Sequence, residues 1–335
     1  MTDRATKIQM FLNNASWGDA VRKPLAGDAS RRRYERLKNT DGQDAILMDA
    51  DPATGEDVVP FIKIANHLND CGLNAPEIFA ADPQNGMLLL QDFGNGLFAK
   101  LMADDPNCQR ELYTHAVDVL LALHKCPMPD PIPAYPPLMP DLAALAVVWY
   151  RGGLLSDAPT LEGSLSSLMK DAIAGLPNHD DVLILRDYHS ENLLWLPDKT
   201  GLAKVGLLDF QDAMSGHAAY DLVSLTKDAR RDVPKDIARE LQDYYSAKSG
   251  VNAAEFAQAC ATVSAQRNLR ILGVFARLCI RDGAAHYLDF IPRVWDHLID
   301  DLAHPSLNAL ATFVKDNLPA PTPENLQILR DKCKK

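Results

Sequence analysis

A proline-rich segment constrains what this chain can fold into more than any other stretch of it. The segment CPMPDPIPAYPPLMPDL, residues 126–142, contains seven prolines. Proline has no backbone N–H and its ring fixes φ, so it is excluded from helix interiors and central strands. We therefore expect an extended, fairly stiff connection here, with differently patterned regions on its two sides.

The region before this segment predicts a small α+β unit. Residues 33–37 and 45–49 have the composition of two short strands, joined through the turn residues NTDG. Residues 58–71 carry apolar side chains at helical spacing, and Gly72 marks the end of that helix. A further strand is expected at 86–90.

The region after it is mostly helical in pattern. The expected helices are 142–150, 161–176, 220–228, 236–248, 253–281 and 292–302. One interruption, residues 181–213, contains two apolar runs separated by the turn-rich PDKTG. A chain of 335 residues exceeds the usual size of a single core, so two lobes or domains are expected.

Composition excludes several classes of partner. The formal charge of -11 argues against nucleic acid and anionic membranes, which need a basic face. The N-terminal sequence lacks the apolar core of a signal peptide, and no apolar run is long enough to span a membrane. Six scattered cysteines without a C-x-x-C pair favour a reduced, cytoplasmic protein. The oligomeric state is left open.

The two apolar runs of 181–213 predict a hairpin that carries chemistry. If they pair with Leu193 opposite Leu208, Asn192 falls opposite Asp209. An amide oxygen and a carboxylate at one end of a hairpin suit a hard cation such as Mg²⁺. Asp187, five residues before Asn192, would then be able to accept a proton from a substrate hydroxyl.

These residues resemble a known superfamily. The run D-Y-H-S-E-N, followed 17 residues later by D-F, is similar to the catalytic loop and metal-binding Asp of the aminoglycoside phosphotransferases and choline kinases, relatives of protein kinases. The resemblance implies an α+β, bilobal, protein-kinase-like fold, with a nucleotide-binding lobe at 1–92 and a helical lobe at 93–335. It implies ATP and Mg²⁺, with Asp187 as the catalytic base and with Asn192 and Asp209 as metal ligands.

A second Asp-Phe-Gly occurs earlier, in LLLQDFG at residues 88–94. Asp92 follows a predicted strand at the position of the family's hinge, so we expect a strand-end residue that caps the next turn, or one near nucleotide. By the same resemblance, Leu90 and Gln91 would offer backbone groups to adenine.

The predicted phosphate-binding elements depart from the family pattern. In GDASRRRYERL, residues 27–37, the small residues Gly27, Ala29 and Ser30 would let backbone N–H groups approach phosphates. Met48 stands where the family's phosphate-pairing lysine is expected, and a thioether cannot hold phosphate. The candidate replacements are Arg31, Arg32, Arg33 and Lys38. The alternative is that the arginine run is a solvated strand face.

Three further predictions concern charged and polar residues on both sides of the proline-rich segment. Asp221 fits a structural Asp that caps a helix or ties down the catalytic loop. Glu56 or Asp57 would stand where the family has an ion-pair glutamate. The substrate pocket is expected to draw on Arg267, Asn268, Arg270 and Arg231, with surface charges or interhelical ion pairs as the alternative.

A narrower resemblance points to the acceptor. LRDYHSENLLWLPD and LLDFQDAMSGHAAYDLVSL are similar to bacterial cell-wall-recycling kinases that phosphorylate the anomeric hydroxyl of N-acetylmuramate and N-acetylglucosamine. This implies a small-molecule sugar substrate. Two alternatives stay open: a kinase of another small alcohol, such as an aminoglycoside or choline, and a nucleotide-binding pseudokinase acting as a regulatory module, which Met48 motivates.

Overall fold

The chain packs as two compact units. The computed structural model describes residues 3–25, 31–155, 161–177 and 179–334. Unit 1 comprises Met1–Pro129 and Ser190–Ala213, and unit 2 comprises Asp130–His189 and Met214–Lys335. The first passage between units therefore falls inside the proline-rich segment. The lobes at 1–92 and 93–335 stay a prediction, with bounds that differ from those of the compact units.

Unit 1 is built on a five-stranded antiparallel sheet with the order β1-β2-β3-β5-β4. The strands are β1 (Val21–Pro24), β2 (Arg33–Lys38), β3 (Asp44–Asp49), β4 (Ile78–Asp82) and β5 (Met87–Gln91). The three strands predicted from the sequence correspond to β2, β3 and β5. The two edge strands, β1 and β4, lack a clear apolar pattern because edge strands are only partly covered.

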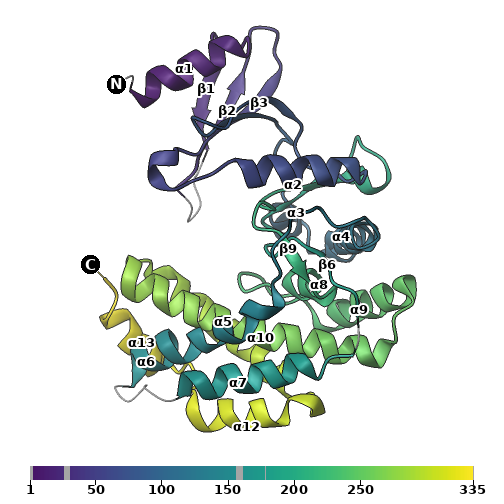
Figure 1. Cartoon of the computed structure of the whole chain (residues 1–335), viewed down its shortest axis with the longest axis vertical. Coiled ribbons are helices and arrows are strands. Elements are labelled where there is room, and N and C mark those ends of the chain that lie inside the picture. The colour runs from purple at the N-terminus through teal and green to yellow at the C-terminus, as the bar shows by residue number, and fades with distance from the viewer. Residues whose placement is uncertain (1–2, 26–30, 156–160, 178, 335) are drawn as a thin grey trace. The chain divides into compact units, whose positions relative to one another are not determined.

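Four helices belong to unit 1: α1 (Arg4–Asn14), α2 (Val59–Asp70), α3 (Phe98–Asp104) and α4 (Gln109–Leu123). Helix α1 lies beside the sheet (Figure 1) and buries Phe11 and Leu12 against Leu47 and Leu89 of the central strands. Helix α2 confirms the predicted helix at 58–71, and Gly72 follows it with a φ of +73°, which glycine adopts without strain.

The predicted hairpin exists, but with a different register. Strands β7 (Leu193–Trp195) and β8 (Val205–Leu207) belong to unit 1 and pair Leu193 with Leu207, so the predicted pairing of Leu193 with Leu208 is wrong by one residue. Apolar residues occupy consecutive positions in both runs, so a one-residue slip exchanges apolar for apolar and the pattern does not fix the register. Gly206 fixes it instead, since a Cβ there would lie 2.8 Å from the ring of Phe93.

Unit 2 is mostly helical. Its helices are α5 (Met139–Leu145), α6 (Gly152–Leu154), α7 (Leu161–Ala174), α8 (Ala219–Thr226), α9 (Lys235–Ser249), α10 (Ala253–Asp282), α11 (Ile291–Leu302), α12 (Asn308–Asn317) and α13 (Pro323–Asp331). All six predicted helices are present, and a π-helical turn at Ala146–Arg151 continues α5. A short antiparallel pair, β6 (Val182–Ile184) with β9 (Met214–Gly216), completes the unit. The α+β fold class is thus confirmed.

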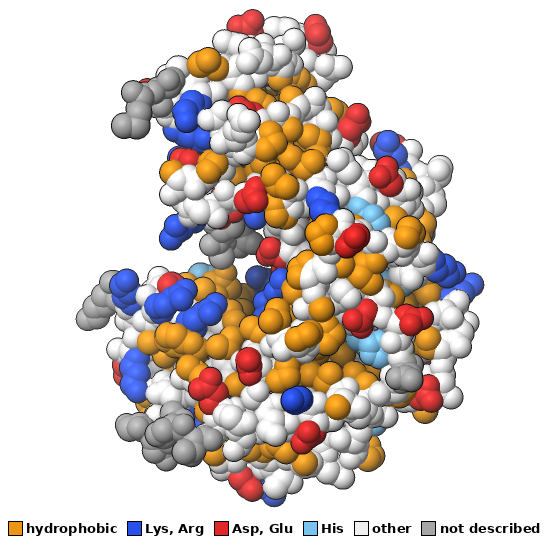
Figure 2. Space-filling model, in the orientation of Figure 1, with side chains coloured by type: hydrophobic (Ala, Val, Ile, Leu, Met, Phe, Trp, Pro, Cys, Tyr) orange, Lys and Arg blue, Asp and Glu red, His pale blue; other side chains and the backbone are white. Residues whose placement is uncertain are grey.

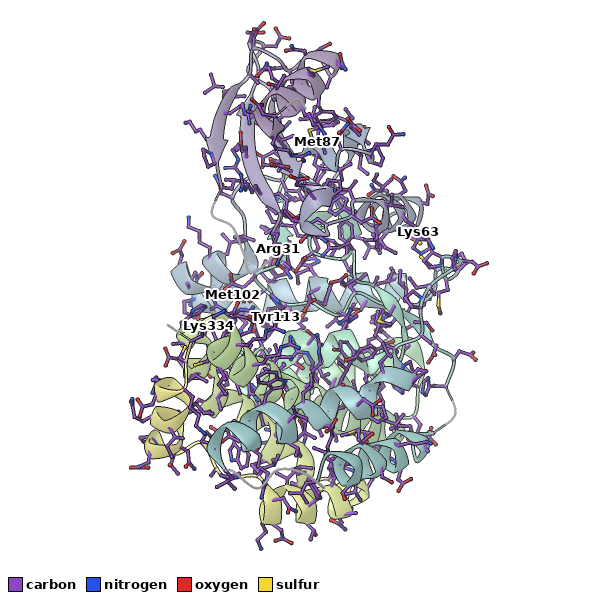
Figure 3. The ribbon with its side chains drawn as sticks, turned by 60° about the vertical axis from the view of Figure 1, so that its left-hand side comes forward. Arg31, Lys63, Met87, Met102, Tyr113 and Lys334 are labelled. Atoms are coloured by element: carbon purple, nitrogen blue, oxygen red, sulfur yellow. The ribbon has the colours of Figure 1, made fainter. Side chains whose placement is uncertain are left out.

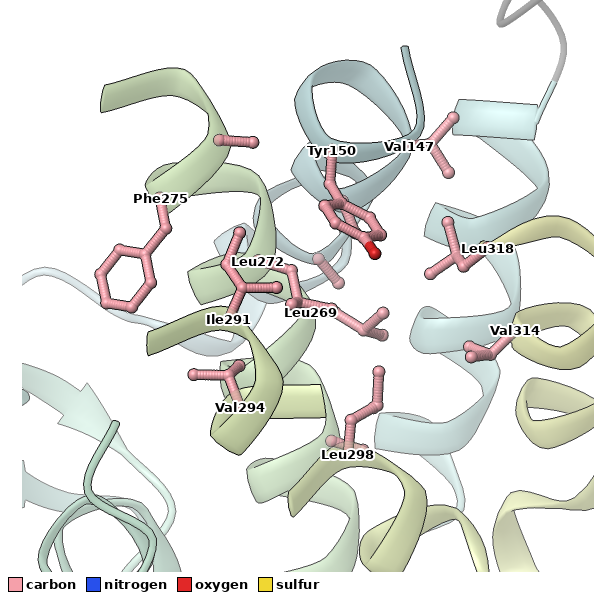
Figure 4. Packing of buried hydrophobic residues seen from close by; sticks show 14 of the residues in the cluster. Val147, Tyr150, Leu269, Leu272, Phe275, Ile291, Val294, Leu298, Val314 and Leu318 are labelled. Carbon is pink, nitrogen blue, oxygen red and sulfur yellow. The ribbon is translucent and has the colours of Figure 1, made fainter. Parts of the chain in front are cut away.

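The core of unit 2 forms around the 30-residue helix α10. Figure 4 shows Leu269 and Leu272 of α10 among Ile291 and Leu298 of α11 and Tyr150 from the π-helical turn. These side chains are fully buried. Burying a Leu or Ile contributes about 1.5–3 kcal/mol relative to exposure, so this cluster is the main source of stability of the helical unit.

The proline-rich segment is less extended than predicted. It is free of α-helix up to Tyr135, but α5 begins at Met139, inside the segment. Pro140 lies in the first turn of that helix, where a missing N–H costs no hydrogen bond. The prediction of an extended connection is therefore wrong for its last residues.

Three features bear on the chain's surroundings. Within the described ranges, no helix combines the length and apolar character needed to cross a membrane. The six cysteines, all in described ranges, are free thiols. On the face shown in Figure 2, acidic and basic side chains are both spread over the surface.

Candidate active site

Asn192 and Asp209 flank the β7–β8 hairpin of unit 1, and their side chains meet. Asn192 Nδ2 donates to Asp209 Oδ2 over 3.4 Å, and Gln211 Nε2 donates to Asp209 Oδ1 over 2.7 Å. In the observed register Asn192 lies opposite Leu208, whose N–H donates to the Asn192 carbonyl. Asp209 follows with a φ of +57°, a left-handed conformation that Asp tolerates better than most residues. The predicted pair thus forms despite the slip in register.

The residues around Asp209 are anchored in unit 1. Phe210 is fully buried, and its ring lies 4.8 Å from that of Phe61 on α2. On the other side, Leu207 N–H donates to the carbonyl of Asn74 over 2.9 Å. Asp209 is therefore held between two fixed points of the same unit.

The donor set of this pair suits magnesium. Mg²⁺ prefers oxygen ligands and is usually held by one or two protein groups together with phosphate oxygens. The Asp209 carboxylate and the Asn192 amide supply such oxygens. A bound cation requires the Asn192 amide to present Oδ1 in place of Nδ2, which a rotation about χ2 achieves.

Asp187 lies in unit 2, after a tight turn. Its N–H donates to the carbonyl of Leu185 over 2.9 Å, which closes a three-residue γ-turn around Arg186. Arg186 has a φ of +71°, a conformation that costs a non-glycine residue free energy. The turn therefore needs support from neighbouring groups.

Asp221 supplies that support. Its carboxylate accepts the N–H of Leu185 over 2.6 Å and the N–H of Arg186 over 2.9 Å. The side chain is fully buried, and burial raises the pKa of Asp221 to about 7 although the two N–H donors lower it. Of the two roles predicted for Asp221, the tie to the catalytic loop is the one observed.

The charge of Asp187 acts on Arg270, which also lies in unit 2. Its NH1 group donates to the hydroxyl of Tyr220 over 3.2 Å. Burial lowers the pKa of Arg270, but Tyr220, Tyr135 and Asp187 outweigh burial and leave that pKa raised. Tyr135 packs edge-on against Tyr220, with ring centroids 5.0 Å apart. The tyrosines were not among the predicted site residues, because their spacing in sequence does not reveal this contact.

Two of the other predicted substrate residues bond to groups in the interior of unit 2. Arg267 is buried and donates to Ser224 Oγ over 2.9 Å. Asn268 is buried and donates to Asp301 over 3.1 Å. These interior partners indicate structural roles. Arg231 lies between α8 and α9, and its substrate role stays a prediction.

The phosphate-binding loop is only partly described. Gly27, Ala29 and Ser30 lie outside the described residues. Arg31, labelled in Figure 3 next to the start of β2, donates to the carbonyl of Thr54 over 2.9 Å, and Arg33 is exposed. Neither observation tests a contact with nucleotide, so the roles of Arg31 and Arg33 stay predictions.

The remaining candidate cations have different partners. Lys38 pairs with Asp44 over 3.0 Å at the far end of β2. Arg32 pairs with Glu56, Nε to Oε2 over 2.8 Å. Met48 is 1% exposed and sits in the interior of the sheet.

The segment after β5 contains the early Asp-Phe-Gly, and its contacts show what Asp92 does. Asp92 pairs with Arg36 of β2 and accepts the N–H of Gly94 over 2.7 Å, so it caps the turn as expected. Leu90 is buried within β5, and Gln91 N–H donates to the carbonyl of Glu77 over 2.8 Å. The sheet thus uses this N–H, and an adenine contact from these residues would depend on other backbone groups.

Comparison with protein families gives one match that covers most of the chain. A model of the family described as Phosphotransferase enzyme family matches residues 21–258. Two curated relatives carry the name N-acetylmuramate/N-acetylglucosamine kinase. The relative from Caulobacter vibrioides is 35% identical over 96% of this chain and 98% of its own. The relative from Pseudomonas aeruginosa is 32% identical over 84% and 85%, respectively.

Solved structures support the same fold. A choline kinase from Streptococcus pneumoniae matches with a TM-score of 0.61 at 13% identity, over 89% of this chain and 100% of that chain. An aminoglycoside 2'-phosphotransferase in complex with GDP also reaches a TM-score of 0.61, at 16% identity over 93% of this chain and 100% of that one. At these identities the likeness concerns the fold alone.

Proposed function

The chain belongs to the phosphotransferase enzyme family, and we propose that it transfers the γ-phosphate of ATP to the anomeric hydroxyl of N-acetylmuramate and N-acetylglucosamine. Relatives that carry this activity in their names align over nearly the whole chain. The observation that carries the proposal is the contact between Asn192 and Asp209, which provides oxygen ligands in a segment that also holds Asp187. We expect the enzyme to act in the cytoplasm on this small-molecule substrate.

On the nucleotide side, we assign Asn192 and Asp209 to Mg²⁺. The bound ion neutralises charge on the phosphates of ATP. The backbone of Gly27, Ala29 and Ser30, with Arg31 and Arg33, is assigned to the phosphates, and the end of β5 at Leu90 and Gln91 to adenine. Phe210, packed on Phe61, keeps Asp209 in place for this task.

On the acceptor side, Asp187 orients the sugar hydroxyl and accepts its proton. An anomeric hydroxyl is more acidic than an ordinary alcohol, so a carboxylate is a sufficient base, and positioning supplies most of the catalysis. Of the four residues predicted for substrate, Arg270 is acted on by the charge of Asp187, and we assign it to the lactyl carboxylate of N-acetylmuramate. Arg231 is a second candidate, while Arg267 donates to Ser224 Oγ, which in turn donates to the carbonyl of Arg186 over 3.4 Å and so supports the loop.

The test is ATP- and Mg²⁺-dependent phosphorylation of a panel containing N-acetylmuramate, N-acetylglucosamine, glucose, choline and kanamycin, with Asp187→Asn in parallel. Transfer to the two N-acetylated sugars that is lost in the variant supports the proposal. Transfer to choline or kanamycin alone would replace it with a kinase of another alcohol. ATP binding without turnover on any acceptor would favour a pseudokinase.

A further inference from the structure

The arginines at the start of β2 are held in different ways. Arg31 and Arg33 are exposed, whereas Arg32 between them is half-buried. The side chains of Arg32 and its partner Glu56 are 13% and 17% exposed, and the pair is closed by a 2.8 Å contact from Nε to Oε2. Glu56 lies just before α2, so this ion pair joins the first strand of the β2–β3 hairpin to the segment that opens the helix.

Arg32 directly precedes β2 (Arg33–Lys38), and its charge acts on Tyr34, which shares a face of the sheet with Met48. Tyr34 is directly opposite Met48 in the pairing of β2 with β3. Directly opposite residues of an antiparallel pair share a face, and side chains two residues apart on a strand share it too. Tyr34, two residues after Arg32, therefore lies on the face on which residue 48 presents a buried thioether.

The charges of Arg32 and of Asp209, the residue assigned above to the metal, both act on the hydroxyl of Tyr34 within unit 1. The pKa of Tyr34 is raised, first by burial and then by the charges of Asp209 and Glu56, while Arg32 acts in the opposite direction. Each of these charges is therefore close enough to act on the Tyr34 hydroxyl. Arg32 and Asp209 thus belong to one neighbourhood of unit 1.

We propose that Arg32 binds the polyphosphate of a nucleoside triphosphate and that Glu56 positions its guanidinium for that contact. The proposal rests on the function proposed above. In protein kinases an ion pair between a strand lysine and a helix glutamate has this role. Here the cation comes from the residue directly before β2, and it is an arginine, whose planar guanidinium suits phosphate oxygens while Nε is engaged by Glu56.

The test compares Arg32→Gln with a matched ion pair on the same sheet. Arg22 pairs with Glu35 over 2.6 Å, with side chains 30% and 25% exposed, and Arg22→Gln removes the same charge from the same unit. Isothermal titration calorimetry gives Kd for ATP, ADP and adenosine, with Mg²⁺ and with EDTA. Measurements in EDTA isolate the protein–phosphate contact from the contribution of the metal.

Arg32→Gln should raise the Kd of ATP and of ADP about 10- to 100-fold, both with Mg²⁺ and with EDTA. The Kd of adenosine should change less than about 2-fold. Arg22→Gln should leave the Kd values of ATP, ADP and adenosine unchanged. Glu56→Gln should also raise the Kd of ATP, but by less, since the guanidinium remains and only its positioning is lost. Arg32→Lys, which keeps the charge, should recover part of the ATP affinity and guards against a folding defect in the glutamine variant.

The proposal is overturned if Arg32→Gln binds ATP with the wild-type Kd, or if the affinity for adenosine falls in parallel with that for ATP. Its failure is distinguishable from failure of the proposed function. A wild-type protein that binds ATP through Arg32 but phosphorylates none of the sugars leaves this inference standing and removes only the acceptor assignment.

Discussion

The two ends of the catalytic segment are held in place by different means. Asp187, in unit 2, follows a left-handed Arg186 that Asp221 fixes through backbone N–H groups. Asp209, in unit 1, is itself left-handed and is held through side chains, those of Asn192 and Gln211. A base needs one fixed position, whereas a metal ligand must exchange protein partners for a cation. The difference in support matches the difference between the roles proposed for Asp187 and Asp209.

The largest loss of activity is expected for Asp187→Asn, at the unit 2 end of the catalytic segment. The amide keeps the shape of the side chain but accepts no proton, so kcat should fall by about 10²- to 10⁴-fold. ATP affinity and the melting temperature should stay at wild-type values, because the support of the turn runs through Asp221. Steady-state kinetics and calorimetry check both. Equal loss of ATP binding would show that Asp187 belongs to the nucleotide side.

The matching change at the unit 1 end is Asp209→Asn. Loss of the charged ligand should raise the Mg²⁺ concentration needed for half-maximal activity by at least about 10- to 100-fold. Excess Mg²⁺ should restore part of the activity, which it cannot do for Asp187→Asn. Activity measured across a Mg²⁺ titration separates the two variants, and a loss independent of Mg²⁺ would contradict the metal assignment.

A smaller effect should distinguish the two acceptors. Arg270→Gln keeps a donor for Tyr220 but removes the positive charge. The value of kcat/KM for N-acetylmuramate should drop about 10-fold relative to N-acetylglucosamine, because only the former carries a carboxylate. Competition between the two sugars in one reaction measures this ratio directly. An unchanged ratio would remove Arg270 from the carboxylate site.

The smallest effect concerns Asp221, which supports the turn before Asp187, and it depends on pH. Burial raises the pKa of Asp221 from 3.8 to about 7, so the folded state binds this proton more tightly than the unfolded state. Its contribution to stability is complete below about pH 4 and is lost as pH rises toward 7. Asp221→Asn should lower the free energy of unfolding by about 1–3 kcal/mol at low pH and flatten this slope. Urea denaturation of the wild type and the variant at pH 5 and pH 8 gives the comparison. If the free energy of unfolding changes equally with pH in both proteins, the assigned role of Asp221 is contradicted.

Much of the fold follows from local patterns, and the failures have identifiable causes. The helix at 58–71 and the β2–β3 hairpin were predicted because their periodicity is strong and Gly72 and NTDG mark their limits. The β7–β8 register depends on the approach of the Phe93 ring to Gly206, a contact between segments more than a hundred residues apart. No local pattern encodes that contact.

The site shows the same division. Asn192 and Asp209 were predicted as a pair, and the left-handed Asp209 brings them together even though the assumed register is wrong. Arg267 and Asn268 were also predicted for substrate, and that role stays a prediction, because their side chains bond to Ser224 and Asp301 in the interior of unit 2, which their spacing in sequence does not show. From the sequence, the three adjacent arginines before Tyr34 were equivalent. Only the paired strands and Glu56 distinguish the middle one.

The interleaving of the two units constrains how the chain is made. Unit 1 takes its last piece from Ser190–Ala213, and unit 2 takes its first from Asp130–His189 and the rest from Met214 onward. During synthesis the sheet of unit 1 is complete long before its β7–β8 hairpin leaves the ribosome. The nascent chain must therefore hold an unfinished unit 1 while residues of the other unit emerge, a period in which apolar surface is open to chaperones and to aggregation.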